Sequence, residues 1–295
     1  KSWEHKTVGH KFKITQIRDK LKIFVDNLPF QLTLSQKKVI DEIFQDLAKD
    51  VPMNRLLQGD VGSGKTVVAA IAMLAANLNG YQAAIMAPTE ILANQHYKTL
   101  KILGLNVGLA TGNNKKDLHA DIIVGTHALL NDKIDFKKLG LVIIDEQHRF
   151  GVEQRAILSG KGDNPHLLTM TATPIPRTVA LTLYGDLDMS VLTDMPEDRL
   201  PVKTWVVSEN KRNAAYDWIS AQKTQTFIIC PFIEESETMQ TVKAATTEFE
   251  RLKKIFKNER LGLIHGKIKD KDKILAAFEN KKTAILVATP VVEVG

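Results

Sequence analysis

The feature that most restricts the fold of this chain is a glycine-rich segment, residues 59–66, with the sequence GDVGSGKT. A candidate buried strand at 55–58, with the sequence RLLQ, precedes it, and an apolar helix-forming stretch at 67–78 follows it. A strand, a G-x-x-x-x-G-K-T loop and a helix in this order form the signature of a phosphate-binding loop. The segment therefore predicts an α/β fold in which backbone N–H groups and a helix N-terminus converge on phosphate oxygens.

Short apolar runs alternate with amphipathic helices along the rest of the 295-residue chain. Runs of this kind, separated by helices, predict parallel sheets that helices cover on both faces. Strands are expected at 55–58, 83–87, 121–125, 141–144 and 167–170. After a proline-punctuated acidic linker the pattern restarts. Beyond the linker, strands are expected at 204–207, 226–230, 262–264 and 284–288, and helices near 210–222, 236–257 and 270–280.

This pattern divides the chain into three parts. In residues 1–27 basic side chains outnumber acidic ones, which predicts a basic amphipathic linker helix leading in from a missing upstream domain. Residues 28–200 are expected to form an α/β lobe that contains the phosphate-binding loop. Residues 201–295 are expected to form a second, incomplete α/β lobe, because a domain commonly has ~100–150 residues.

Composition narrows the class of protein without deciding it. Forty Lys+Arg against 34 Asp+Glu give a formal net charge of +6, which favours a polyanionic partner such as nucleic acid, although many globular proteins carry this charge without one. The single cysteine, Cys230, cannot form an internal disulfide, which is typical of the cytosol. The longest apolar run, 67–76, is far shorter than the ~18 residues of a membrane helix. We therefore expect a cytoplasmic monomer with no membrane contact.

The loop and a later acidic pair carry the candidate chemistry. Lys65 is expected to reach the β- and γ-phosphates of ATP, and the Thr66 hydroxyl to bind Mg²⁺. Asp145 and Glu146 follow the expected strand 141–144. Beside a phosphate loop, Asp145 is a candidate Mg²⁺ ligand and Glu146 a candidate base for the attacking water, the alternative being an ordinary acidic turn. The loop residues expected to bind ATP are Gly59, Asp60, Val61, Gly62, Ser63, Gly64, Lys65 and Thr66.

Two further motifs separate this chain from other phosphate-loop proteins. Gln147 and His148 directly follow the acidic pair, and the sequence TATP at 171–174 follows the next expected strand. With a second α/β lobe that lacks its own phosphate loop, this set resembles the superfamily 2 helicases, which have tandem RecA-like domains. The resemblance implies catalytic roles for Gln147 and His148, and coupling of the ATP and DNA sites by Thr171, Ala172, Thr173 and Arg177.

The same resemblance implies how the adenine is recognised. It assigns Gln36 to the adenine edge, while Phe30 packs on the ring. Thr33 and Gln36 also match a capping box at the start of a helix. The capping role is the alternative for Gln36, and the two roles are compatible.

Longer segments resemble one family within that superfamily, the bacterial RecG helicases. These segments are PMNRLLQ at 52–58, DEQHRFGV at 145–152, MTATPIPRT at 170–178 and VATPVVEVG at 287–295. The resemblance implies an ATP-dependent translocase on double-stranded, branched DNA, active in replication-fork reversal and junction migration during repair and recombination. The transcription-repair coupling translocase shares two of these segments and is the alternative.

The family also implies contacts to the DNA backbone. Thr89 and Glu90 lie at an expected helix start, and Thr126 and His127 follow the expected strand 121–125. Hydroxyls and helix N-termini suit phosphate oxygens, which position a protein on DNA without reading its sequence. The alternative for both threonines is an ordinary helix cap.

Three departures from the family affect the expected activity. The family has an upstream wedge domain, a threonine where Pro290 stands, and an arginine-rich motif after the segment that ends at Gly295. The chain alone is therefore expected to hydrolyse ATP weakly or not at all. The motor interpretation therefore competes with a second one, in which the chain is a module that binds ATP and DNA without turnover. A small-molecule kinase is a third interpretation, and the second lobe argues against it.

Overall fold

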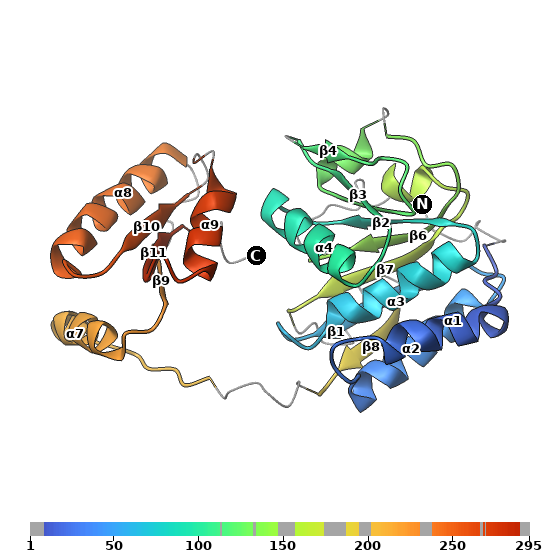
Figure 1. Ribbon diagram of the computed structural model, residues 1–295, viewed down its shortest axis with the longest axis horizontal. Coiled ribbons are helices and arrows are strands. Elements are labelled where there is room, and N and C mark those ends of the chain that lie inside the picture. Colours follow the sequence, from blue (N-terminus) through green and yellow to red (C-terminus); the bar gives the residue numbers. More distant parts are fainter. Residues whose placement is uncertain are drawn as a thin grey trace. The chain divides into compact units, whose positions relative to one another are not determined.

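The computed structural model describes residues 9–112, 114–131, 134–146, 157–173, 187–194, 202–230, 238–265, 268 and 270–289. The chain divides into two compact units, Lys1–Leu200 and Pro201–Gly295, which are described one at a time. Figure 1 shows the elements of both units and their labels.

The first unit is built on an eight-stranded sheet with the strand order β4-β3-β5-β2-β6-β7-β1-β8. Neighbouring strands run parallel except β3 and β4, which are antiparallel. The strands are β1 Asn54–Gly59, β2 Gln82–Met86, β3 Val107–Ala110, β4 Lys115–Lys116, β5 Ile122–Gly125, β6 Leu139–Ile144, β7 His166–Thr171 and β8 Asp188–Leu192. The expected α/β fold with a parallel sheet is confirmed here.

Both faces of this sheet are covered, because successive side chains of a strand point to opposite sides. Ala83 and Ile85 of β2 belong to one apolar cluster, while Ala84 and Met86 belong to another. The first cluster includes side chains of α1 Ile14–Asp26, α2 Leu34–Leu47, α3 Lys65–Leu78 and α4 Glu90–Ile102. The second is completed by residues around the short 3₁₀ helix η1 His127–Leu130 and by Phe136.

Helix α3 is the centre of the first cluster. It packs on β1, β2 and β6 and also contacts α1 and α2 (Figure 1). A helix covered on several sides must be apolar nearly all round, which explains the run of Val, Ala, Ile and Met that follows the glycine-rich loop. The helix expected within residues 1–27 is present as α1, and Phe12, Ile17 and Leu21 are buried against this core. That segment is thus packed into the first unit.

A buried ion cluster joins α2 to β1 and β8. The Arg55 Nε donates to Asp46 Oδ2 over 2.7 Å, and its Nη1 donates to the Ser190 hydroxyl over 2.8 Å. Glu42 approaches Arg55 within 3.4 Å and also accepts from the Ser190 hydroxyl. Because a buried charge is costly without a partner, these contacts require α2 to lie over this end of the sheet.

The end of β8 is also bonded to the start of α2. The backbone N–H of Ser35 donates to Asp194 Oδ2 over 2.8 Å, and the Asp194 N–H donates to the Ser35 hydroxyl over 3.3 Å. These bonds satisfy one of the N–H groups that a helix N-terminus leaves without an internal partner. Hydrogen bonds from the backbone and the side chain of Ser35 lower the pKa of the Asp194 carboxyl.

The second unit has a three-stranded parallel sheet in its described part, with the order β10-β11-β9. Its strands are β9 Thr226–Ile229, β10 Leu261–Ile264 and β11 Ile285–Ala288, and its helices are α7 Arg212–Gln222, α8 Thr238–Ile255 and α9 Lys271–Glu279, with the 3₁₀ turn η3 Glu209–Lys211. The three α-helices agree with the expected ones to within two residues at most ends.

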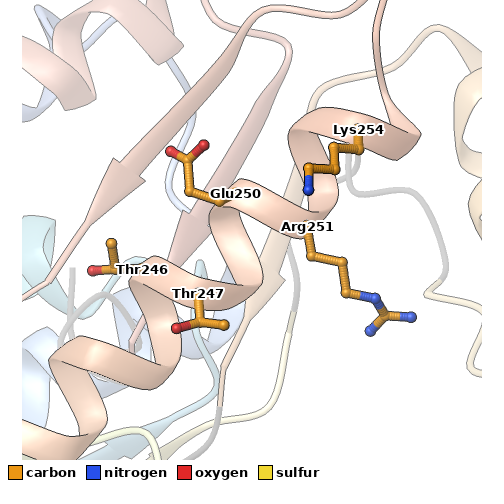
Figure 2. A pocket seen from close by; sticks show the side chains of 5 residues that line it. All are labelled: Thr246, Thr247, Glu250, Arg251 and Lys254. Atoms are coloured by element: carbon orange, nitrogen blue, oxygen red, sulfur yellow. The ribbon is translucent and has the colours of Figure 1, made fainter.

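Helix α8 has an apolar side and a polar side. Leu252 is buried in the apolar cluster, with Phe249 packed against it. A polar face of the same helix lines a shallow surface hollow, and Figure 2 shows its five side chains, Thr246, Thr247, Glu250, Arg251 and Lys254. Residues three and four apart share a helix face, so this spacing separates the apolar and polar sides.

The prediction of one strand was wrong. Residues 204–207 are neither helix nor strand, and Trp205 and Val206 are exposed. A strand needs a neighbour for its backbone N–H and C=O groups, and β9 pairs only with β11 among the described residues. The sequence pattern also missed β3, β4 and β8. In the described part of the chain, no helix has the length and apolar composition needed to cross a bilayer.

Candidate nucleotide-binding site

The glycine-rich loop connects the end of β1 to the first turn of α3, as its sequence predicts. Gly62 and Gly64 have φ angles of 82° and 88°, a left-handed backbone that glycine adopts without a steric cost. A side chain at Gly64 would also collide with the amide of Gln36. The loop can therefore turn its N–H groups inward only with glycine at these positions.

Lys65 is folded back over the loop. Its Nζ donates to the carbonyls of Gly59 at 2.7 Å and Asp60 at 3.1 Å. Burial lowers the pKa of Lys65, and the negative charges of Asp145, Glu146 and Asp60 act in the opposite direction. The ammonium is thus close to the acidic pair, in a position where phosphate oxygens can replace the two carbonyls.

Gln36 joins α2 to the loop. Its Nε2 donates to the carbonyl of Ser63 over 2.9 Å, and its Oε1 accepts from the N–H of Thr33 over 2.9 Å. The capping box expected from the sequence is therefore present. An amide has two donor hydrogens and two acceptor lone pairs, so Gln36 keeps hydrogen-bonding capacity for an adenine edge. Phe30 is about half exposed nearby in the chain.

The acidic pair lies at the carboxyl end of β6. The backbone N–H of Asp145 donates to Met86 over 2.9 Å, which fixes this strand end beside β2. One carboxylate oxygen of Asp145 accepts from the Glu146 N–H over 3.0 Å, and the other lies 2.7 Å from Nε2 of His96. Glu146 has a φ of 50°, which is uncommon for a residue with a side chain and concentrates at functional sites.

The expected coupling motif lies one strand away. The register of the sheet pairs Gln58 of β1 with Thr171 of β7, so Thr171 adjoins the start of the loop. The Thr171 hydroxyl accepts from the Thr173 N–H over 3.1 Å, and Thr171 is fully buried. The TAT segment therefore forms a tight turn beside the loop, with Ala172 between the two threonines.

The residues expected to contact DNA lie at the same edge of the sheet. Thr89 and Glu90 follow β2, Thr126 and His127 follow β5, and these two strands are paired with Met86 opposite Gly125. The Thr89 hydroxyl caps α4 by accepting from the Leu92 N–H over 3.2 Å. Thr126 makes no such bond to η1, so the capping alternative holds for Thr89 only.

The donor set suits a nucleotide with a hard metal ion. Thr66 at the start of α3 and the buried Asp145 supply oxygen ligands of the type that Mg²⁺ prefers, and Lys65 supplies the positive charge for phosphate. Within the described ranges, no group of three or more His, Cys, Asp or Glu side chains is arranged to hold a metal without a nucleotide.

Comparison with known protein families identifies the family of this chain. The family model described as DEAD/DEAH box helicase matches residues 33–182, slightly more than half of the chain, and this span contains the loop, the acidic pair and the TAT turn. The chain belongs to the DEAD/DEAH box helicase family. Its first unit is the part that carries the family's sequence.

Relatives and solved structures agree with this assignment. The chain is 52% identical to the ATP-dependent DNA helicase RecG of Synechocystis sp. over 93% of its own length and 36% of the relative. A solved structure of RecG bound to a three-way DNA junction matches with a TM-score of 0.73 and 38% identity, over 96% of this chain and 39% of that one. The chain spans less than half the length of the RecG relatives that it matches.

A more distant structure supports the fold alone. A variant of Saccharomyces cerevisiae Dbp5 bound to RNA and ADP BeF3 matches with a TM-score of 0.70 and 17% identity, over 96% of this chain and 76% of that one. Together with the family match and the RecG structure, it confirms the expected tandem RecA-like architecture, and the identities above confirm the resemblance to RecG.

Some predicted site residues lie outside the described part of the chain. These are Gln147, His148 and Arg177. Sequence reasoning also missed one residue that the structure places in the site, His96. The sequence carried one signal for this residue. His96 lies three residues after Ala93 and four before Leu100, the spacing of the buried side of α4.

Proposed function

We propose that this chain is the ATP-driven motor portion of a RecG-like translocase that acts on branched, double-stranded DNA in repair and recombination. The observation that carries the proposal is the match to RecG, in sequence and in fold, across both units of the chain. The RecG relatives favour this interpretation over the transcription-repair coupling type.

The nucleotide is assigned to the loop and its neighbours. Lys65 exchanges its bonds to Gly59 and Asp60 for phosphate oxygens, and the loop N–H groups surround the same oxygens. Thr66 and Asp145 hold Mg²⁺, which when bound neutralises charge on the phosphates. Gln36 and Phe30 recognise the adenine from the start of α2 and the segment before it.

Hydrolysis is assigned to the acidic pair and the residues after it. Glu146 orients and deprotonates the attacking water, and its positive φ is of the kind that concentrates at functional sites. Gln147 and His148 belong to this set by resemblance. The turn at Thr171–Thr173 adjoins the loop, and with Ala172 and Arg177 it is assigned to coupling ATP turnover to DNA movement.

We assign binding of the DNA backbone to the edge of the first sheet, where Thr89, Glu90, Thr126 and His127 follow β2 and β5. Thr126 supports this because its hydroxyl is not used for capping, and a helix N-terminus such as that of α4 favours phosphate. Sequence-independent contacts of this kind suit a motor that tracks along duplex. A motor on DNA works where the DNA is, which in bacteria is the cytosol, and we propose that it acts as a monomer.

The experiment compares binding with turnover. Binding of a labelled three-way DNA junction should weaken steeply as salt rises, because phosphate contacts release counterions. Because the chain alone is expected to turn over weakly, phosphate release from ATP is measured with and without the junction on this chain and on a version extended through the arginine-rich motif. Junction-stimulated release from the extended version separates the motor from a module that binds both ligands without turnover. The motor assignment fails if neither ATP nor junction DNA binds, or if binding of DNA is indifferent to salt.

A further inference from the structure

His96 is a polar residue on the buried side of a helix that otherwise contacts the core with apolar side chains. It is 6% exposed, and it follows the cap residue Thr89 by two turns of α4. Its partner is Asp145, 49 positions later in the chain, with Nε2 and Oδ2 2.7 Å apart. A buried imidazole without a partner is costly, so this bond explains how a histidine is tolerated there. It does not explain why the partner is the metal-binding carboxylate.

The bond determines the orientation of that carboxylate. An ionised carboxylate only accepts hydrogen bonds, so Nε2 of His96 carries the proton and donates. The other oxygen accepts from the Glu146 N–H over 3.0 Å. With both oxygens held by donors on different elements, the Asp145 side chain cannot rotate freely. Groups that hold a metal ligand in this way preset the direction in which it meets the ion.

Helix α4 connects this bond to the other edge residues. It begins at Glu90 behind the Thr89 cap and runs to Ile102, packed on β3 and β5. Thr89 and His96 are seven residues apart on one helix, or about 10 Å at 1.5 Å per residue. A helix of this length moves as a rigid body, so a displacement of its first turn by a bound phosphate carries His96 with it.

We infer that His96 is a positioning residue that sets the Asp145 carboxylate for Mg²⁺ and makes its orientation respond to DNA at the start of α4. The inference rests on the proposed function, which supplies both ligands. The pairing with Asp145 gives a direct path between the two sites within the first unit, through one helix and one hydrogen bond.

The first test measures the metal without turnover. Mn²⁺ binding in the presence of ADP is followed by electron paramagnetic resonance of the free ion. His96→Leu should weaken Mn²⁺ binding about 10-fold or more, as loss of an outer-shell partner commonly does. ADP affinity without metal should stay within about 2-fold, because no atom of His96 belongs to the phosphate loop. His96→Gln, which offers a side-chain N–H at a similar reach, should recover most of the loss.

The matched control is His166→Leu. His166 is another buried histidine of the first unit, but it lies at the amino end of β7, with hydrogen bonds to Met53 and His10. This variant should leave the Mn²⁺ affinity unchanged. An equal loss in both leucine variants would overturn the inference, because it would indicate general loosening of the sheet. Failure of His96→Gln to recover binding would also overturn it.

The second test adds DNA. A three-way junction should change the Mn²⁺ affinity of the ADP-bound wild-type chain, and by linkage Mn²⁺ should change the affinity for the junction by the same factor. In His96→Leu that factor should fall close to one. The inference fails, while the proposed function stands, if the wild-type chain binds ADP and the junction but its Mn²⁺ affinity does not change with the junction. It also fails if His96→Leu shows the same change in Mn²⁺ affinity as wild type. If wild-type chain binds neither ligand, the proposed function fails and the inference falls with it.

Discussion

Gln36 Nε2 donates to the carbonyl of Ser63 over 2.9 Å, so the start of α2 is tied to the middle of the phosphate-binding loop. The same side chain accepts from the Thr33 N–H. A single residue thus links the capping of a helix to the shape of the loop. The Thr33 hydroxyl accepts from the Gln36 N–H over 3.2 Å, so a variant at Thr33 weakens the helix cap and leaves the bond of Gln36 to the loop in place.

Gln36→Ala should lower both stability and nucleotide affinity, because it removes the cap partner and the bond to the loop. Thr33→Ala should lower stability by about 1 kcal/mol, the usual cost of a lost cap, while nucleotide affinity stays nearly unchanged. Urea unfolding and titration with a fluorescent ATP analogue measure the two effects. Equal losses of nucleotide affinity in the two variants would argue that Gln36 acts through the helix alone.

Lys65→Ala should weaken ATP binding 10- to 100-fold, since a charge-assisted hydrogen bond contributes about 1.5–3 kcal/mol. The same fluorescent titration measures it. Lys37→Ala removes an equal charge from the exposed side of α2 and should leave affinity unchanged. If Lys65→Ala binds ATP as tightly as wild type, the assignment of ATP binding to the glycine-rich loop is wrong.

Arg55→Met should destabilise the first unit by about 3 kcal/mol, the lower end of the usual range, because it removes the buried partner of the Asp46 carboxylate and leaves that carboxylate only the exposed Lys49. The side chains of Arg55 and Asp46 are 9% and 5% exposed. The control is the exposed pair of Lys11 and Asp50, where Lys11→Met should change the free energy of unfolding very little. Urea unfolding of both variants gives the comparison, and a small loss for Arg55→Met would mean that the cluster rearranges.

The buried His166 should make the unfolding free energy depend on pH. Burial lowers the pKa of His166 from 6.5 to about 4, so the native state keeps it neutral while the unfolded chain takes up a proton. Stability is therefore complete above pH 6.5 and is lost as the pH falls towards 4, by about 3 kcal/mol in all.

His166→Asn tests this, since the asparagine oxygen can accept from Met53 as Nδ1 does and does not titrate. The variant should lose less stability than wild type between pH 7.5 and 4.5 in urea unfolding. His119→Asn, at an exposed histidine, should follow the wild-type pH dependence. Identical curves for wild type and His166→Asn would exclude His166 as the source.

The sequence predicted those parts of the site whose geometry is local. The loop at 59–66 predicts its own conformation because strand, glycines and helix are contiguous, and β6 ends directly in Asp145. The pairing of His96 with Asp145 could not be predicted, because it depends on how α4 packs over the sheet. The strand expected at 204–207 failed for a related reason. A strand is defined by its neighbour, which the segment's own residues do not determine.

The position of β1 has a consequence for how the protein is made. This strand lies between β7 and β8, and both are synthesised long after it. On the ribosome, β1 therefore waits without β7 until Thr171 has left the exit tunnel, and without β8 until Leu192 has left it. Pairings this distant in sequence form slowly, and α3 is too apolar to remain exposed meanwhile. The nascent chain is therefore expected to need chaperone protection until then, and to acquire its affinity for ATP only as the last strand of the sheet is added.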